Sequence, residues 1–379
     1  MKRSLFFAIG LALGLLFAGC QAQHQKISIN PAVEVALDAL QPLVDSCGIP
    51  VFQYAYFSPN GELHGLVCAQ DTVFDLPLPI GEESIFQAAS LSKPLFAYIV
   101  MKMVDRGQID LDRPIADYTD IDRFEDKEMA RRLTPRIVIS HQTGLPNWAA
   151  GPSSDEWPTS RITFKYPADS CFAYSGEGYA FLQRAVEAIQ GQPLDEIARR
   201  EVFEPFDMPT TSYAWLPVYD SLAVPGYNRD GENRGQGRHP RENCAYTLRT
   251  NAIEYAHFIK RGLLEGEGLT EALHKAMFTP QVHAQRYADE PRACDSSVFW
   301  CLGFGAVSTG QTVEGLPAKG DYFWHWGDNG NFKALWLLHP STKEGFVYFS
   351  NRATGHDLLD PFLKYLTGDD LPLNDWIRN

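Results

Sequence analysis

The sequence has little positive charge, and it has no long apolar run after residue 20. Its 33 Lys and Arg residues stand against 47 Asp and Glu residues, which gives a formal net charge of −14. An acidic surface repels nucleic acid and anionic lipid headgroups. A transmembrane helix needs about 20 consecutive apolar residues, and no later segment reaches that length. We therefore expect no nucleic-acid partner and no membrane-spanning helix in the body of the chain.

The seven cysteines lack the spacing of a metal site. We therefore expect no metal and no other cofactor. If Cys20 is set apart, an even number remains, which in an exported protein suggests disulfides. Several pairings are open, and Cys294 with Cys301 is favoured because this pair would close a short loop. The remaining cysteines are Cys47, Cys68, Cys171, Cys244, Cys294 and Cys301.

The first residues have the composition of a targeting signal. Lys2 and Arg3 form a basic start, and Leu5 to Phe17 is an apolar stretch that is too short to span a bilayer. The segment Phe17-Ala18-Gly19-Cys20 resembles the lipobox of bacterial lipoproteins. In that family the Cys carries diacylglycerol and becomes the mature N-terminus.

This resemblance implies a signal peptide over residues 1–19 and a polar tether over residues 20–31. The protein would then lie in the bacterial cell envelope, facing the periplasm or the exterior, and its membrane contact would be the lipid on Cys20. The alternative is an ordinary signal peptide that is cut near Ala22.

The rest of the chain has an α+β pattern, which we assign to one domain over residues 32–368 and a tail over 369–379. Strand patterns occur near both ends, in about 32–90 and 250–368, whereas amphipathic helices and long loops fill 91–249. We predict one sheet built from both chain ends, flanked by helices, with a mainly helical part inserted. The strand patterns are Val51 to Ser58, Leu63 to Val67, Tyr322 to Trp326, Phe332 to His339 and Gly345 to Ser350.

The most informative motif is Ser90-Leu91-Ser92-Lys93, where a Ser is followed three residues later by a Lys. Pro94 is tolerated only in the first turn of a helix, so the apolar helix over Leu95 to Val104 must begin close to Ser90. Lys93 then projects from the same helix face as Ser90. A hydroxyl nucleophile and an amine that can take its proton would lie together. The alternative is a buried helix with a Ser cap and an incidental Lys.

Two later segments have the composition of a site. Tyr174 is followed by small residues just before a predicted helix, which can hold its hydroxyl rigidly in a cleft. The segment Phe323 to Phe332 is a strand, a Gly-rich turn and a second strand, and its glycines allow close approach of a ligand or another backbone. The alternatives are a core Tyr at a helix start and an ordinary hairpin with an aromatic face.

The order Ser-x-x-Lys, Tyr, His-x-Gly resembles serine hydrolases related to class C β-lactamases and D-alanyl-D-alanine carboxypeptidases. The resemblance runs from about residue 34 to about residue 366 and implies a β-lactamase or penicillin-binding-protein-like fold with an antiparallel sheet. It includes the connecting segments Gly107-Gln108-Ile109-Asp110-Leu111-Asp112, Ile137-Val138-Ile139-Ser140-His141-Gln142-Thr143-Gly144-Leu145 and Gly303-Phe304-Gly305.

The resemblance also implies roles for individual residues. Ser90 would be the acylated nucleophile, Lys93 its proton acceptor, and Tyr174 the group that passes a proton to the leaving group. The backbone N–H groups of Ser90 and Asp328 would form the oxyanion hole. His141 is expected to order a loop.

The cleft residues depart from the family pattern. His325, Trp326 and Gly327 stand where the family has a Lys-Thr-Gly strand, and Gly176 replaces an Asn whose amide binds the substrate's acyl-amide carbonyl. His325 is expected to add only partial positive charge near neutral pH. This sequence therefore has fewer polar contacts for peptide-like acids than the family pattern, although Ser90 and Lys93 are kept.

We therefore expect a serine hydrolase that acts on a small-molecule or peptide-like substrate through an acyl-enzyme, with esters favoured. One alternative is a D-amino-acid peptidase, a carboxypeptidase or a weak β-lactamase. A second alternative is a non-catalytic, penicillin-binding-like sensor lipoprotein.

Overall fold

The computed structural model describes residues 40–70, 74, 76, 79–285, 296–307, 312–313, 316–317, 321–367 and 371–378. The predicted leader and tether lie outside these residues, and so do Cys20 and Cys294. The lipid anchor and the Cys294–Cys301 pair therefore stay predictions. Within the described ranges no helix is both long and apolar enough to cross a bilayer. The five cysteines of these ranges form no disulfide with one another.

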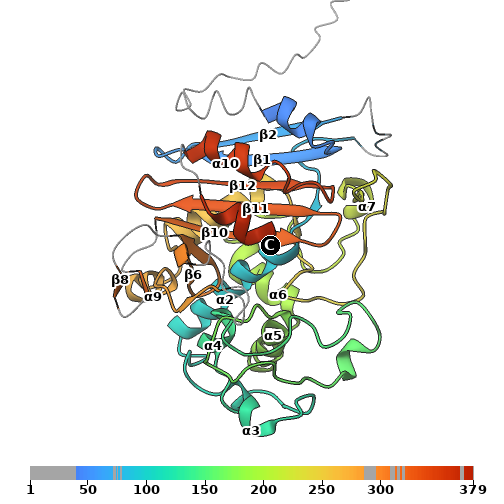
Figure 1. Cartoon of the computed structure of the whole chain (residues 1–379). Helices are drawn as coiled ribbons and strands as arrows, with labels where there is room; N and C mark the ends of the chain where they lie inside the picture. The colour runs from blue at the N-terminus through green and yellow to red at the C-terminus, as the bar shows by residue number, and fades with distance from the viewer. Residues whose placement is uncertain are drawn as a thin grey trace, which may run out of the picture.

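A sheet of eight strands forms the upper half of the molecule in Figure 1, in the order β2-β1-β12-β11-β10-β7-β6-β5. Neighbouring strands are antiparallel throughout this order. The N-terminal strand β1 lies directly against β12 from the C-terminal end, which confirms the predicted sheet from both chain ends. The strands are β1 Val51–Phe57, β2 Leu63–Ala69, β5 Val282–His283, β6 Val298–Trp300, β7 Gly305–Val307, β10 Tyr322–Asp328, β11 Lys333–His339 and β12 Glu344–Ser350.

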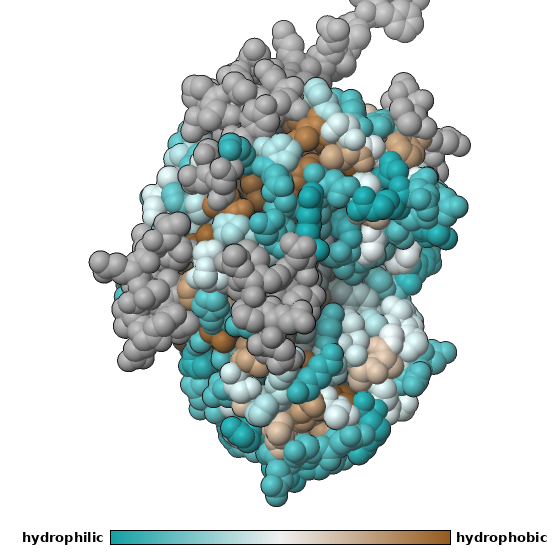
Figure 2. Space-filling model, in the orientation of Figure 1, coloured by the Kyte–Doolittle hydropathy of each residue, from teal (hydrophilic) through white to brown (hydrophobic). Residues whose placement is uncertain are grey.

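Both faces of the sheet are buried, because side chains alternate between two separate cores. Along β1, Val51, Ala55 and Phe57 face the core shared with the helical part, whereas Phe52 and Tyr54 face the core under the terminal helices. The terminal helices comprise residues 40–46, α10 Leu359–Thr367 and α11 Leu373–Arg378. On the face seen in Figure 2, hydrophilic residues cover most of the described surface.

The C-terminal end differs from the predicted tail over 369–379. Residues 373–378 form α11, and the indole of Trp376 is fully buried, with its Nε1 donating to the carbonyl of Ala284 at 2.7 Å. The apolar residues Leu373 and Ile377 lie one helical turn apart. This spacing was available in the sequence, and the domain continues through α11.

The chain passes from the sheet into the helical part and returns to the sheet at neighbouring points. Strand β3 Phe86–Gln87 pairs with β4 Arg249–Thr250, so the two crossing points lie side by side. The predicted insertion of a mainly helical part is confirmed, and Ser90 lies three residues past this pair. The helices are α2 Ser92–Asp105, α3 Lys127–Ala130, α4 Pro135–Ile139, α5 Gly176–Gln190, α6 Leu194–Ala198 and α7 Tyr219–Leu222, then α8 Ala252–His257 and α9 Glu271–Met277. Helices α6 and α8 continue as π-helical turns over Arg199–Phe203 and Phe258–Leu264.

Candidate active site

Ser90 lies in a 3₁₀ turn, Ala89–Leu91, that leads directly into α2. Ala89 has φ +49°, a left-handed conformation that costs energy in a residue with a Cβ atom. The next turn is held by Ser92, whose Oγ donates to the carbonyl of Ala89 at 2.6 Å and accepts from the Leu248 N–H at 3.1 Å. The helix begins where Pro94 predicted, and the turn that carries Ser90 is fixed by the core around it.

Lys93 is buried beside Ser90. Its Nζ lies 3.2 Å from Ser90 Oγ and donates to the carbonyl of Ala245 at 2.8 Å. Burial lowers the pKa of Lys93 to about 7, because the charged ammonium is taken out of water. A large share of this amine is therefore neutral at pH 7, and a neutral amine can accept the Ser90 proton.

Tyr174 lies against Lys93, with its ring centre 4.7 Å from Nζ. The backbone after it is fixed, because Ser175 caps α5 by accepting from the Gly178 N–H at 3.0 Å. His141 Nδ1 accepts from the Ser175 N–H at 3.1 Å, and its ring lies 4.2 Å from that of Tyr174. His141 thus holds the loop that carries Tyr174, and burial with the nearby Lys93 keeps the pKa of His141 well below its usual range.

The structure differs from the expectation that His325 adds partial charge. The imidazole is fully buried in β10, and its Nδ1 lies 2.7 Å from the carbonyl of Trp326. Burial and the nearby Lys93 hold the pKa of His325 well below the ordinary histidine value. His325 is therefore a neutral side chain at physiological pH, and it does not line the pocket at Ser90.

Trp326 and Gly327 do not line the pocket either. The indole of Trp326 is buried among aromatic rings, 4.9 Å from the ring of Tyr174 and 5.1 Å from that of Trp376. A Cβ atom on Gly327 would lie 2.5 Å from the Ala88 carbonyl oxygen, so only glycine lets β10 pack against the Ser90 turn. Both residues therefore pack against residues of the site without lining the pocket.

Gly176, at the start of α5, also leaves no room for a Cβ atom. A Cβ atom there would lie 2.3 Å from the indole of Trp148, so this ring fills the space into which a side chain would project. The Gly176 N–H donates to Asn147 Oδ1 at 2.9 Å. Trp148 and Asn147 line the pocket, whereas Gly176 does not. Of the amide side chains that line the pocket, that of Asn147 is therefore the one in contact with Gly176.

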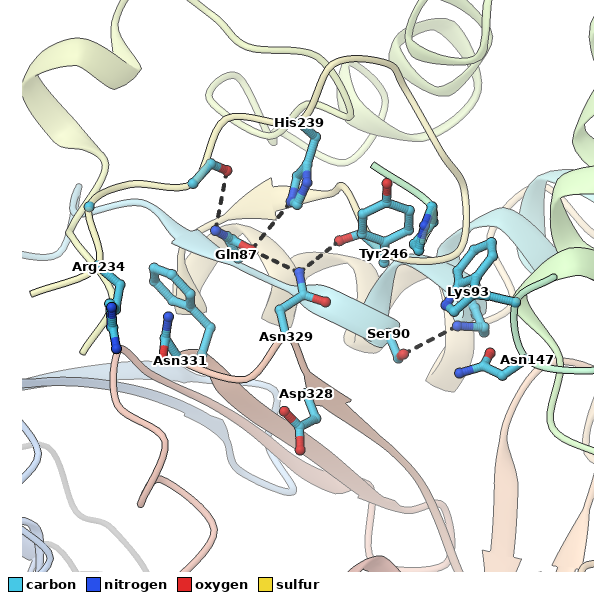
Figure 3. A pocket seen from close by; sticks show the side chains of 15 residues that line it. Gln87, Ser90, Lys93, Asn147, Arg234, His239, Tyr246, Asp328, Asn329 and Asn331 are labelled. Atoms are coloured by element: carbon cyan, nitrogen blue, oxygen red, sulfur yellow. Dashed lines mark hydrogen bonds between the residues drawn. The ribbon is translucent and has the colours of Figure 1, made fainter. Parts of the chain in front are cut away.

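The pocket has a volume of about 340 Å³, and Figure 3 shows Ser90 and Lys93 at one end of it and Arg234 at the other. Its lining comes from four segments: the Ser90 turn, the loop after α4, the loop before β4 and the turn after β10. The lining residues are Gln87, Ser90, Lys93, Asn147, Trp148, Pro152, Arg234, Gly235, Gly237, His239, Tyr246, Asp328, Asn329, Asn331 and Phe332.

Gln87 connects three of these segments. Its Oε1 accepts from Asn329 Nδ2 at 2.8 Å, and its Nε2 donates to the carbonyl of Gln236 at 3.0 Å. His239 Nε2 lies 3.3 Å from the same Oε1, and burial lowers the pKa of His239 to about 4. Sequence reasoning missed Gln87, Asn147 and Trp148, because a strand of two residues and a loop are too short or too irregular to show a periodicity.

Comparison with known proteins places the chain in a family. The model of the β-lactamase family matches residues 60–366. The chain belongs to the β-lactamase family. Penicillin-binding protein 4 of Amycolatopsis lactamdurans is 30% identical over 33% of this chain and 35% of its own length. Penicillin-binding protein 4* of Bacillus subtilis (strain 168) is 20% identical over 76% of this chain and 65% of its own length. The matched region thus spans less than two thirds of each relative.

Solved structures of this family have the same fold. A class C β-lactamase with 15% identity has a TM-score of 0.72, covering 91% of this chain and 99% of its own. The D-alanine carboxypeptidase AmpC from Burkholderia cenocepacia has a TM-score of 0.71 at 14% identity, covering 89% and 98%. A D-stereospecific amidohydrolase from Streptomyces sp. has a TM-score of 0.68 at 14% identity, covering 89% and 99%. The β-lactamase-like fold is confirmed, and the family is one of serine hydrolases.

Proposed function

We propose that this protein is a serine hydrolase that forms an acyl-enzyme at Ser90 and acts preferentially on esters. The observation that carries the proposal is the contact of 3.2 Å between Lys93 Nζ and Ser90 Oγ, with the pKa of Lys93 lowered to about 7. A nucleophilic hydroxyl needs a nearby base that is unprotonated at the working pH.

In this reaction Ser90 Oγ attacks the substrate carbonyl carbon, and its proton moves to Lys93. The carbonyl oxygen becomes an oxyanion that accepts hydrogen bonds from the backbone N–H groups of Ser90 and Asp328. Tyr174 passes a proton to the leaving group as the tetrahedral intermediate collapses. The same groups then activate a water molecule, which releases the acid and restores Ser90.

The charges of the pocket support esters over β-lactams. A β-lactam brings a carboxylate that must be held beside Ser90, whereas His325 is buried and neutral. The positively charged side chains that line the pocket come from Lys93 and Arg234, whereas His239 is neutral. Arg234 Nη2 pairs with Glu232 at 3.0 Å and lies across the pocket in Figure 3. An ester leaving group also needs less help from a proton donor than an amide.

The test compares p-nitrophenyl butyrate with the chromogenic cephalosporin nitrocefin on the same purified enzyme. We expect kcat/KM for the ester to be larger by about ten- to a hundredfold, the loss that two missing polar contacts cause. Nitrocefin turnover equal to the ester's would contradict the ester preference. A fluorophosphonate probe separates both outcomes from a non-catalytic sensor, which would leave Ser90 unlabelled.

A second candidate function is hydrolysis of peptide-like amides, and it is favoured by Asn147. This amide lines the pocket with its Oδ1 engaged by the Gly176 N–H, so its Nδ2 group is left to donate to a substrate carbonyl. A panel of D-amino-acid p-nitroanilides tests it. Turnover of these amides that falls in Asn147→Ala more than butyrate turnover does would favour this candidate.

We also propose that the protein is a bacterial envelope lipoprotein anchored through Cys20. The support is the basic start, the apolar stretch and the Ala18-Gly19-Cys20 ending of the sequence. Cys20→Ser should move the protein from the membrane fraction to the soluble fraction. Unchanged partitioning would contradict the anchor.

A further inference from the structure

One side of the pocket is a continuous row of rings. The rings of Trp148 and Tyr246 lie 5.5 Å apart at an interplanar angle of 76°. Tyr246 in turn lies 4.9 Å from the ring of His239 at 82°. All three side chains line the pocket that contains Ser90. Two neighbouring rings that stand nearly perpendicular form a corner with two apolar sides.

This row is held rigidly and carries no charge. Tyr246 Oη shares a hydrogen bond of 3.2 Å with Ser153 Oγ, and burial lowers the pKa of His239 to about 4. The half-buried Trp148 packs on its other side against Trp157, with ring centres 5.9 Å apart at 78°. A bound group would therefore meet preformed apolar surfaces, with little ordering cost.

A buried carboxylate fixes the segment that carries Trp148. Glu177 is fully buried and accepts from the Ala149 N–H at 3.0 Å and from Trp157 Nε1 at 2.6 Å. Arg123 compensates its charge at 3.2 Å. Because Glu177 lies on α5, close behind Tyr174, the ring row and the reacting groups are held by the same helix end. This arrangement keeps the distance between them constant.

We infer that the substrate carries a flat apolar ring, which packs into the corner between Trp148 and Tyr246 while the reacting carbonyl is at Ser90. A planar ring stacks on one side of a perpendicular pair and meets the edge of the other, and both geometries are favourable. An alkyl chain of similar length fills the corner without this match. The inference rests on the proposed function, since Ser90 must hold the substrate. Trp148 is then a specificity-determining residue.

The test uses boronic acids, which add reversibly to a serine hydroxyl: Ser90 Oγ donates an electron pair to boron, and its proton moves to Lys93. Protection of Ser90 from fluorophosphonate labelling gives the inhibition constants of 2-phenylethylboronic acid and of hexylboronic acid, whose chain has a similar length. We expect the phenyl compound to bind about tenfold more tightly to the wild-type enzyme. Trp148→Ala should abolish this ratio, and Trp148→Phe, which keeps a ring, should retain part of it.

The outcomes separate the two proposals. If Ser90 is labelled but both boronic acids protect it equally, the ring inference is overturned and the proposed function stands. A ratio that is the same in Trp148→Ala and in the wild type overturns it as well. If Ser90 reacts with neither reagent in the folded protein, the proposed function fails and the ring inference with it. A circular dichroism spectrum confirms that each variant is folded.

Discussion

The inner and the outer half of the site are built in different ways. The inner half comprises Ser90, Lys93 and Tyr174, which core elements hold: the Ser90 turn, α2 and the start of α5. The outer half is the pocket lining from the loops around Trp148 and His239 and from the turn after β10. It is held by hydrogen bonds from side chains to the loop backbone and to one another.

The difference explains which features of the family are kept. In the inner half Lys93 is fully buried and Ser90 and Tyr174 are partly buried, so the replacement of one of these residues disturbs packing as well as chemistry. A loop residue exchanges one contact for another with little effect on the fold. The sequence motifs of the inner half accordingly resemble those of the family, whereas Gly176 stands where the resemblance implies an amide, and Trp148 fills the space beside it. We expect catalysis to depend on the inner half and selectivity on the outer half.

Removing the nucleophile should have the largest effect. Ser90→Ala is expected to lower kcat/KM by about 10⁴-fold or more and to abolish fluorophosphonate labelling, because Ser90 is the serine whose hydroxyl lies at hydrogen-bond distance from Lys93 Nζ in the described contacts. Activity assays and intact-protein mass spectrometry measure both effects. Labelling that persists and maps to another residue would refute this assignment. Ser153→Ala, in the outer half, is the matched control and should still be labelled.

Lys93 and Tyr174 should behave as one proton-transfer unit. Lys93→Ala and Tyr174→Phe are each expected to lower kcat by roughly 10³-fold. The double variant should be little worse than either single variant, because residues that act together are not additive. Their contact of 4.7 Å between Nζ and the ring centre is the structural reason. Losses that simply multiply would show independent roles.

The pH dependence should report Lys93. Because the neutral amine is the reactive form, kcat/KM should fall about tenfold per pH unit below the pKa of Lys93, which is about 7. The pKa values of His141 and His325 lie well below the usual range and that of His239 is about 4, so these groups do not produce this limb.

A pH profile of ester hydrolysis at constant ionic strength measures the limb. His325→Gln serves as the control and should leave its midpoint near 7. If the midpoint moves or the limb disappears in that variant, the titrating base is His325 and not Lys93.

Sequence reasoning predicted the inner half and the fold because both leave periodic or positional signals. Pro94 fixed the start of a helix beside Ser90, and strand patterns at both chain ends predicted the sheet. The end of the domain was missed, although Leu373 and Trp376 have helical spacing. The pH behaviour of His325 could not be predicted, because its pKa depends on burial by residues far away in the sequence.

The outer half left no such signal. The space beside Gly176 is either empty or filled by another side chain. Which of the two holds depends on how the loop after α4 packs against the start of α5. That loop is held by backbone contacts such as the Glu177 N–H to the Asn147 carbonyl at 3.0 Å, which no residue pattern announces. The orientation of Trp326 was undetermined for the same kind of reason, because a strand residue's face depends on the register of the whole sheet.

Restoring the family's amide should then have the smallest effect, and it should appear in stability. In Gly176→Asn the new Cβ would lie 2.3 Å from the indole of Trp148, so the ring must move, at a cost of about 2 kcal/mol in the free energy of unfolding. Urea unfolding measures this loss.

Removing the ring should relieve the overlap. The double variant Gly176→Asn/Trp148→Ala is expected to be more stable than the two single losses predict, since directly contacting sites are not additive. Gly191→Asn is the matched control: this glycine caps the other end of α5 in a left-handed conformation that Asn tolerates, and its added Cβ meets no neighbour within the described residues. If the two losses at 176 and 148 simply add, Trp148 does not occupy the space of the missing amide. The outer half would then be rearranged in some other way than the exchange of one side chain for another.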